Sequence, residues 1–481
     1  MQSDASTIDV SPQTARPQTS SPRTVPGPPV NVLSLLSFLL FGSPQDLLGF
    51  YMNATQEYGD IVSFGGTSAW ATYFVSHPDY VKHILQDNNH NYGKKNWLND
   101  MIKPLAGEGL LTSEGDGWRR RRKLAQPAFH RERIAAFATG MTNTTTTMLE
   151  RWEPVVGQQQ PQQSQRQQQS IDIVHEMQRL TLGIVSTALF SIDISGDSDE
   201  MGSALNDIFA YFNHRSRTPL SLPASIPTRR NRRFKHAVQR LDAITYQVIE
   251  EHRQSETKSD DLLSMLLEAR DEETGEGLSN IQLRDEVGTF LAAGHETTAM
   301  TLSWTWYMLS KHPAVEHKLH AELTEVLSGR LPTAADIPQL RYTRMVIQEV
   351  MRLYPAAWAM TRGIVEDDEI GGYPIKAGAI MILSPYVTHR HPDFWDNPEG
   401  FDPERFTPER IAERPRYAYF PFGGGPRQCI GNEFALMEAQ LIVAMVAQRY
   451  RLDLIPGQKI EPDPIFTLRP KTAVRFALHA R

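Results

Sequence analysis

The chain has 481 residues, enough to bury a large core, and its apolar (40%) and charged (22%) fractions are ordinary for a globular protein. Its net charge of −7 gives no reason to expect a nucleic-acid partner. The single cysteine, Cys429, argues against a disulfide framework and against a zinc site built from several thiolates, and it favours a reducing compartment.

Residues 1–29 are rich in Pro, Ser, Thr and Gln, which predicts a disordered N-terminal lead. The apolar run at 32–41 is shorter than the ~20 residues that cross a bilayer, and no basic segment precedes it. We therefore expect a short core or membrane-surface helix there, and neither a signal peptide nor a transmembrane segment. Segments 60–66 and 70–76 predict the two strands of a hairpin.

Two later segments predict exposed connections. The Gln-rich stretch 158–169 is of low complexity and is expected to be a solvent loop inserted between helices. Residues 217–234 contain several prolines and then a basic cluster, which predicts a connection between two helices. The cluster favours a solvated face, and contact with a membrane or an access channel is the alternative.

The clearest predicted element is a long helix. Ser279 and Gln282 fit a capping box, and helical periodicity runs over 281–312 to a stop at Pro313. At 1.5 Å per residue, such a helix spans ~48 Å and crosses a whole domain. Three further elements are expected after it: a helix at 340–354, short strands within 364–386, and a last helix from about Gly431 to Tyr450.

The lone cysteine lies in the segment "FPFGGGPRQCIGNEFA", just before the last predicted helix. Free backbone N–H groups at a helix start favour a thiolate, and Gly431 would let backbone approach the sulfur closely. Phe422 could shield the sulfur from water. Glycines 423–425 would let the chain turn tightly and lie flat against a large partner, with Arg427 beside it. A lone cysteine is more often a small core residue, but a core position needs neither the glycines nor the arginine.

The segment "AGHETT" at 293–298 interrupts the long predicted helix with poor helix formers. Glycine inside a helix costs about 1 kcal/mol relative to alanine. Thr297 can bond a carbonyl one turn back, which predicts a local bulge that brings the Glu296 carboxylate and a hydroxyl together for proton delivery. The alternative is a polar pair on a solvated face.

Two further groups of charged residues stand out. Glu349 and Arg352 share one helix face among apolar neighbours, and Arg405 is a candidate third partner for a buried pair. Trp118 and Arg122 are i, i+4 neighbours that could clamp a carboxylate. The basic residues at 119, 120, 121 and 123 cannot all face one way, so some should form an exposed patch for an acidic partner.

In this order, these segments resemble the cytochrome P450 family of haem-thiolate monooxygenases over residues 30–481. "AGHETT" matches A/G-G-x-D/E-T, "EVMR" matches E-x-x-R and is followed by "PERF", and "GDGWRRRR" matches W-x-x-x-R. The resemblance implies a mainly α fold with a small β region: the cytochrome P450 fold, as a single large haem-binding domain of the soluble bacterial type with a long central helix. The pattern F-x-x-G-x-R-x-C-x-G is matched at Phe422, Gly425, Arg427, Cys429 and Gly431.

The resemblance also implies roles for these residues. Cys429 would be the axial ligand of haem b, the iron protoporphyrin IX cofactor, and Glu296 and Thr297 would deliver protons to dioxygen at the haem. Glu349, Arg352 and Arg405 would form a structural network on the cysteine side. The cofactor-binding residues would be Trp118, Arg122, Arg362, His389, Phe422, Arg427 and Gly431, with Arg362 and His389 placed by position alone.

The expected pocket is apolar, which suits a small hydrophobic substrate. The wording of the motifs resembles that of bacterial fatty-acid and terpene hydroxylases, so the resemblance implies a fatty acid or a terpenoid. Electrons would come from a separate ferredoxin or flavodoxin-type donor with its reductase, docked on the exposed part of 119–123 with Arg131 and Arg133. We expect a monomer in the cytoplasm, and peripheral contact with a membrane stays open. The expected pocket residues are Trp97, Met101, Phe209, Phe212, Phe290, Ala293, Ala357, Trp358 and Phe466.

Three other functions are alternatives to that of a haem-thiolate monooxygenase. A peroxide-driven peroxygenase or hydroperoxide-rearranging enzyme would keep the haem but would not need Glu296 and Thr297. A haem-binding sensor or carrier would need neither the proton relay nor the apolar pocket. A metal hydrolase is disfavoured because "HKLH" and "HRH" lack the spacing and carboxylate of a zinc motif.

Overall fold

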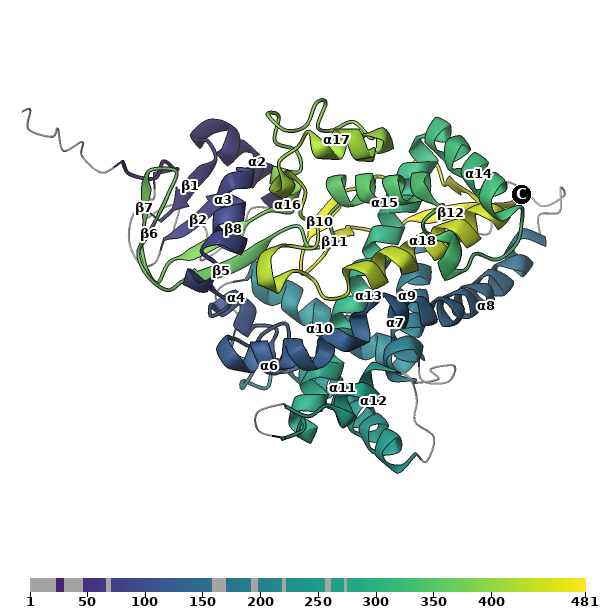
Figure 1. The fold of residues 1–481 in the computed structure, drawn as a ribbon, viewed down its shortest axis with the longest axis horizontal. Coiled ribbons are helices and arrows are strands. Elements are labelled where there is room, and N and C mark those ends of the chain that lie inside the picture. Colours follow the sequence, from purple (N-terminus) through teal and green to yellow (C-terminus); the bar gives the residue numbers. More distant parts are fainter. Residues whose placement is uncertain are drawn as a thin grey trace, which may run out of the picture.

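A mainly helical body lies beside a smaller β region in the computed structural model (Figure 1). The expected loop 158–169 and the apolar run 32–41 lie outside the described residues, as do residues 1–22. Residues 23–29 of the lead, which was expected to be disordered, pack against the rest of the protein. The carbonyl of Pro26 accepts a hydrogen bond from Ser63 N–H at 2.8 Å, and Val25 is buried. The structure describes residues 23–29, 46–65, 71–157, 170–191, 198–218, 222–255, 261–271 and 275–481.

The β region contains a five-stranded sheet with the order β1-β2-β8-β5-β3. Its first two strands pair antiparallel, with Ile61 opposite Val75, which confirms the predicted hairpin. β2 and β8 pair parallel, so the sheet joins segments far apart in sequence. The strands of this sheet are β1 (Ile61–Phe64), β2 (Thr72–Val75), β3 (Tyr92–Gly93), β5 (Met360–Ile364) and β8 (Ile380–Leu383).

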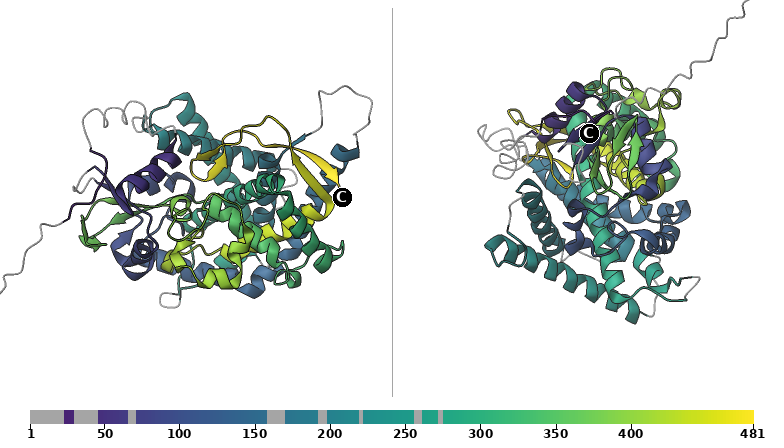
Figure 2. Two further views of the ribbon diagram at one scale, coloured as in Figure 1. Left: turned by 90° about the horizontal axis from the view of Figure 1, so that it is seen from above. Right: turned by 90° about the vertical axis from the view of Figure 1, so that its left-hand side faces the viewer.

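Three smaller sheets complete the β structure of the described residues. They are β6 (Asp368–Ile370) with β7 (Tyr373–Ile375), β10 (Pro462–Pro464) with β11 (Leu468–Pro470), and β4 (Ser170–Asp172) with β12 (Arg475–Ala480) and β9 (Tyr450–Leu454). The C-terminus and β12 lie at the end of the long axis opposite the five-stranded sheet (Figures 1 and 2).

The helices make up most of the body and enclose one large apolar core. The N-terminal half contains α2 (Leu47–Tyr58), α3 (Pro78–Lys82), α4 (Trp97–Asp100), α5 (Lys103–Ala106), α6 (Gly115–Ala125), α7 (Arg131–Ala136), α8 (Ala138–Gly157), α9 (Ile173–Phe190) and α10 (Ser198–Arg217). The C-terminal half contains α11 (Arg229–Gln254), α12 (Leu262–Glu268), α13 (Asn280–Lys311), α14 (Pro313–Leu327), α15 (Arg341–Leu353), α16 (Pro385–Thr388), α17 (Pro408–Ala412) and α18 (Asn432–Arg449).

Helix α13 is the long central helix expected from the sequence, and it starts at the predicted capping box of Ser279 and Gln282. It is buried on most sides and packs along α9. Gly294 is required by this packing, because a Cβ there would lie 2.8 Å from a methyl group of Val185. The bulge expected at 293–298 is wrong: α13 is regular there, and the Thr297 hydroxyl bonds the Ala293 carbonyl at 2.6 Å without breaking the helix.

The connection expected at 217–234 is shorter than predicted. The basic cluster belongs to the first turn of α11, where Thr228 caps the helix by accepting a hydrogen bond from Asn231 N–H at 3.1 Å. Pattern reasoning missed this start because arginines in a first turn oppose the helix dipole. Across the described part of the chain, no helix has the length and apolarity needed to span a membrane.

Candidate active site

Cys429 lies between a short 3-10 turn, η7 (Gly425–Arg427), and the start of α18. Its backbone N–H donates to the Phe422 carbonyl at 3.0 Å, which closes the loop around the sulfur. Burial among protein atoms raises the pKa of its thiol. The N–H of Gly431 and the positive charge of Arg122 act in the opposite direction and favour the thiolate.

Two of the three glycines before Cys429 lie close to other parts of the protein. Gly425 has φ +65°, and a Cβ there would lie 1.7 Å from the carbonyl oxygen of Leu85. A Cβ on Gly424 would lie 2.3 Å from the ring of Tyr417. Gly431 differs, because the nearest atom to its Cβ position is a ring carbon of Phe129 at 3.7 Å. Gly431 therefore keeps free space beside Cys429, and Gly423 is similarly open, with Met360 Cε at 3.7 Å from its Cβ position.

A cluster of buried cations lies close to this loop. Burial, together with the charge of Arg427, lowers the pKa of Arg362 to about 10. Burial and the charges of Arg362 and Arg427 hold the pKa of Lys94 well below its usual range. In the described residues, Glu114 is the carboxylate that partly offsets this charge. Buried positive charges that outnumber their negative partners are stabilised when an anion binds beside them. The two carboxylates of a haem are anions of this kind.

The predicted clamp residues take part in the same region. Arg427 lies over the ring of Trp118, 4.5 Å from its centroid, and donates to the Ser113 carbonyl at 3.0 Å. Arg122 donates to the Gln428 carbonyl at 3.1 Å, and burial lowers the pKa of its guanidinium. Lys94 was missed because no pattern in its sequence neighbourhood marks it.

His389 does not join this cluster, which corrects its expected role. Its ring is fully buried, and Nε2 accepts a hydrogen bond from Phe420 N–H at 2.9 Å. Its carbonyl accepts from Arg352 at 3.0 Å. Burial and the charge of Arg352 hold the pKa of the imidazole well below its usual range, so His389 stays neutral and serves the structural network.

The structure brings Glu349, Arg352 and Arg405 into contact. Arg352 donates two hydrogen bonds to the Glu349 carboxylate, at 2.7 and 2.8 Å, and both side chains have no exposed surface. Arg405 Nε lies 3.4 Å from the same carboxylate. Arg352 also donates to the carbonyls of His389, Pro398 and Gly400. The network thus ties α15 to the segment that precedes the cysteine loop.

Glu296 is buried on α13, and its carboxylate accepts two hydrogen bonds. Gln178 donates to one oxygen at 2.8 Å, and the Thr467 hydroxyl donates to the other at 3.2 Å. Thr297 and Ala293 are more accessible than their helical neighbours. Gln178 and Thr467 lie 118 and 171 residues from Glu296, which is why sequence reasoning missed them.

The expected pocket residues are only partly brought together. Phe466 stacks on Phe209 at 5.4 Å between ring centroids and lies 6.5 Å from Phe212. Phe290 stacks instead on Phe129 at 5.5 Å. Trp97 stands apart on α4, with 52% of its surface exposed. The remaining expected residues are partly accessible or exposed: Met101, Ala293, Ala357 and Trp358, whose indole donates to the Ile465 carbonyl at 2.8 Å.

Comparison with known proteins agrees with this geometry. The family profile "Cytochrome P450" matches residues 26–475. The chain is 37% identical to "Cyclooctatin synthase" of Streptomyces melanosporofaciens over 87% of this chain and 88% of that protein. It is also 37% identical to "Cyclooctat-9-en-7-ol 5-monooxygenase" of the same organism, over 85% of each. The solved structure of "cytochrome P450DA heme domain" matches with a TM-score of 0.83, 27% identity and coverage of 95% of this chain and 98% of that one.

The fold and the cysteine loop thus define a haem-thiolate monooxygenase. The chain belongs to the cytochrome P450 family. It therefore binds haem b and inserts one oxygen atom of O2 into a hydrophobic substrate, and the predicted mainly α fold is confirmed.

Proposed function

We propose that the substrate is an olefinic terpenoid. The aromatic group of Phe209, Phe212 and Phe466 is the observation that carries this proposal, because stacked rings suit a rigid hydrocarbon. The expected pocket residues carry no charge, whereas a fatty acid needs a partner for its carboxylate. The similarity to a protein named as a monooxygenase of cyclooctat-9-en-7-ol supports the same class.

The proposal assigns each site residue a role. Cys429 would hold the haem iron through its sulfur, and the bound haem would supply the chemistry that activates dioxygen. Arg122, Arg362, Arg427 and Lys94 neutralise the propionates, with Trp118 supporting Arg427. Phe422 and Gly431 shape the surroundings of the sulfur.

Glu296 and Thr297 are proposed to hold and move the protons that the reaction consumes. The Thr297 hydroxyl gives its own proton to the Ala293 carbonyl, so its oxygen lone pairs remain free to accept from water. Glu296 is held by neutral donors, Gln178 and Thr467, rather than by a cation. These two donors fix the orientation of the carboxylate that would carry the proton.

A panel of cyclic olefins, olefinic alcohols and fatty acids tests the substrate class. We expect the cyclic olefins and their alcohols to give the low-to-high-spin shift and to be hydroxylated with oxygen from ¹⁸O₂ in the presence of donor proteins. Tight binding and turnover of fatty acids alone would overturn the proposal. Efficient turnover with hydrogen peroxide and no donor proteins would favour the peroxygenase alternative.

We further propose a ferredoxin or flavodoxin-type donor that docks on exposed basic residues near α6 and α7, to a monomeric protein in the cytoplasm. Arg119, Lys123 and Arg131 are exposed, whereas Arg121 is buried against Glu286 at 3.2 Å and Arg120 lies against Asp271 at 3.3 Å. Arg119 and Lys123 lie on α6 with Arg122, and Arg131 begins α7. Because Arg122 contacts the cysteine loop, a donor bound to these residues is near the cysteine side of the haem.

Reversing two of these charges, in Lys123→Glu/Arg131→Glu, is expected to raise the apparent KM for the donor about tenfold and to weaken its salt dependence, because close charge pairs steer association. Steady-state donor reduction at two ionic strengths measures this. The matched control is Lys459→Glu/Lys471→Glu, whose side chains are 83% and 61% exposed beside Glu461. An unchanged KM for the donor in Lys123→Glu/Arg131→Glu would contradict the proposed docking face.

A further inference from the structure

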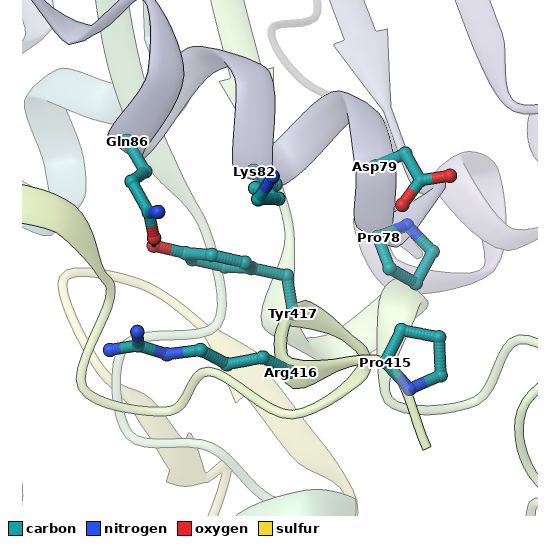
Figure 3. A pocket seen from close by; sticks show the side chains of 7 residues that line it. All are labelled: Pro78, Asp79, Lys82, Gln86, Pro415, Arg416 and Tyr417. Carbon is teal, nitrogen blue, oxygen red and sulfur yellow. Dashed lines mark hydrogen bonds between the residues drawn. The ribbon is translucent and has the colours of Figure 1, made fainter. Parts of the chain in front are cut away.

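A tyrosine outside the family motifs contacts the loop that carries Cys429. Tyr417 lies in a short 3-10 turn, η6 (Arg416–Ala418), and is only 3% exposed. Its hydroxyl accepts a hydrogen bond from Gly425 N–H at 3.1 Å and donates one to Gln86 Oε1 at 3.0 Å. Figure 3 shows the phenol oxygen pointing at the Gln86 amide. One hydroxyl thus joins the cysteine loop to a distant segment.

That distant segment has an unusual backbone. Gln86 belongs to a π-helical turn, η1 (His83–Asp87), and such rare turns are frequent at functional sites. The same turn presents the Leu85 carbonyl to Gly425, so closely that a Cβ on Gly425 would clash with it. The turn itself is anchored, because Asp368 lies 2.8 Å from the His83 ring nitrogen and accepts from Asn88 at 3.0 Å. The loop therefore rests on a fixed support.

The contact at Gly425 reaches Cys429 through a short path. Gly425 begins η7, and its carbonyl accepts from Gln428 N–H at 3.1 Å, one residue before the cysteine. The ring of Tyr417 also limits Gly424, where any side chain would clash. A shift at Gly425 would therefore move the sulfur relative to α18.

We propose that Tyr417 is a positioning residue for the axial thiolate: through Gly425 it sets the place of the Cys429 sulfur, with Gln86 fixing the phenol. The proposal rests on the proposed role of Cys429 as the iron ligand. Tyr417 touches neither substrate nor reacting atoms, so its removal acts on ligation rather than on substrate contacts.

The Tyr417 hydroxyl can be removed without opening the core. Tyr417 and Gln86 line a small surface pocket together with Pro78, Lys82 and Pro415 (Figure 3). Tyr417→Phe keeps the ring that packs on Gly424 and deletes only the oxygen. We therefore expect this variant to fold and to take up haem.

The test measures the ligation of the haem-loaded protein. The reduced, CO-bound protein is placed in mild denaturant, and the strongly red-shifted Soret band is followed as it converts to the unshifted band. This conversion should be at least about five-fold faster in Tyr417→Phe than in wild type. That factor corresponds to about 1 kcal/mol, the contribution of the hydrogen bond to Gly425 alone. Hydrogen exchange at the Gly425 amide should accelerate by a similar factor. Gln86→Leu should behave alike, and Gln86→Glu, which keeps an acceptor, should remain near wild type.

The matched control is Tyr419→Phe. It deletes a buried phenol oxygen two residues away, but that hydroxyl donates to the Gln348 carbonyl on α15 at 3.0 Å instead of contacting the loop. Equal effects of the two variants, or wild-type rates in Tyr417→Phe, would overturn the proposal. A wild-type protein that never shows the red-shifted band would instead overturn the role of Cys429, so the two failures are distinguishable.

Discussion

Cys429→Ser is expected to abolish the strongly red-shifted Soret band of the reduced, CO-bound protein and to remove monooxygenase turnover completely. The serine hydroxyl is nearly isosteric, but it does not ionise near neutral pH and so offers iron no comparable anion. Burial raises the pKa of the Cys429 thiol, but Gly431 N–H and the charge of Arg122 partly offset this, and a thiolate is the sulfur form that binds iron. The measurement is the reduced CO difference spectrum, taken beside substrate turnover.

Haem content separates loss of ligation from loss of the cofactor. The buried cations that surround Arg427 are unchanged in Cys429→Ser, so part of the haem should remain bound. Cys429→Ala is the second variant, because it offers no ligand atom. A red-shifted band that survives in both variants would refute the thiolate assignment.

Local sequence patterns predicted those parts of the fold whose cause is local. The long helix α13 follows from its capping box and its periodicity, and the β1–β2 hairpin follows from two short alternating runs. The contact between Glu349 and Arg352 follows from their i, i+3 spacing on one helix. In each case the partners lie within a few residues of one another or in adjacent elements.

The features that were missed depend on contacts between distant segments. Lys94 joins the cation cluster only because β3 and β5 pair, which brings the segment after Tyr92 beside Arg362. Gly294 was expected to weaken the long helix, and Gly425 to let the chain turn against a large partner, but a Cβ at either position would also meet a neighbour, Val185 or Leu85. At these two positions the neighbour that excludes a side chain comes from a distant segment, so only the fold identifies it.

Arg352→Leu is expected to cost about 3–5 kcal/mol of unfolding free energy, because it leaves the buried Glu349 carboxylate without its main partner. It also strips donors from the carbonyls of His389, Pro398 and Gly400, which lie in the segments that lead to the cysteine loop. We therefore expect poor haem incorporation as well as lower stability. Denaturant unfolding and the haem-to-protein ratio measure the two effects.

Two further variants show whether charge or geometry matters. Arg352→Lys keeps the charge but cannot form the paired hydrogen bonds to Glu349, so it should recover only a minor part of the loss. The matched control is Lys376→Leu, which breaks an exposed pair with Asp367 and should leave the unfolding free energy nearly unchanged. A cost for Arg352→Leu as small as that of the control would contradict the view that the buried network holds the cysteine side of the fold together. Burial explains the difference between the two pairs, because water replaces the lost partner of Asp367 but cannot reach the carboxylate of Glu349.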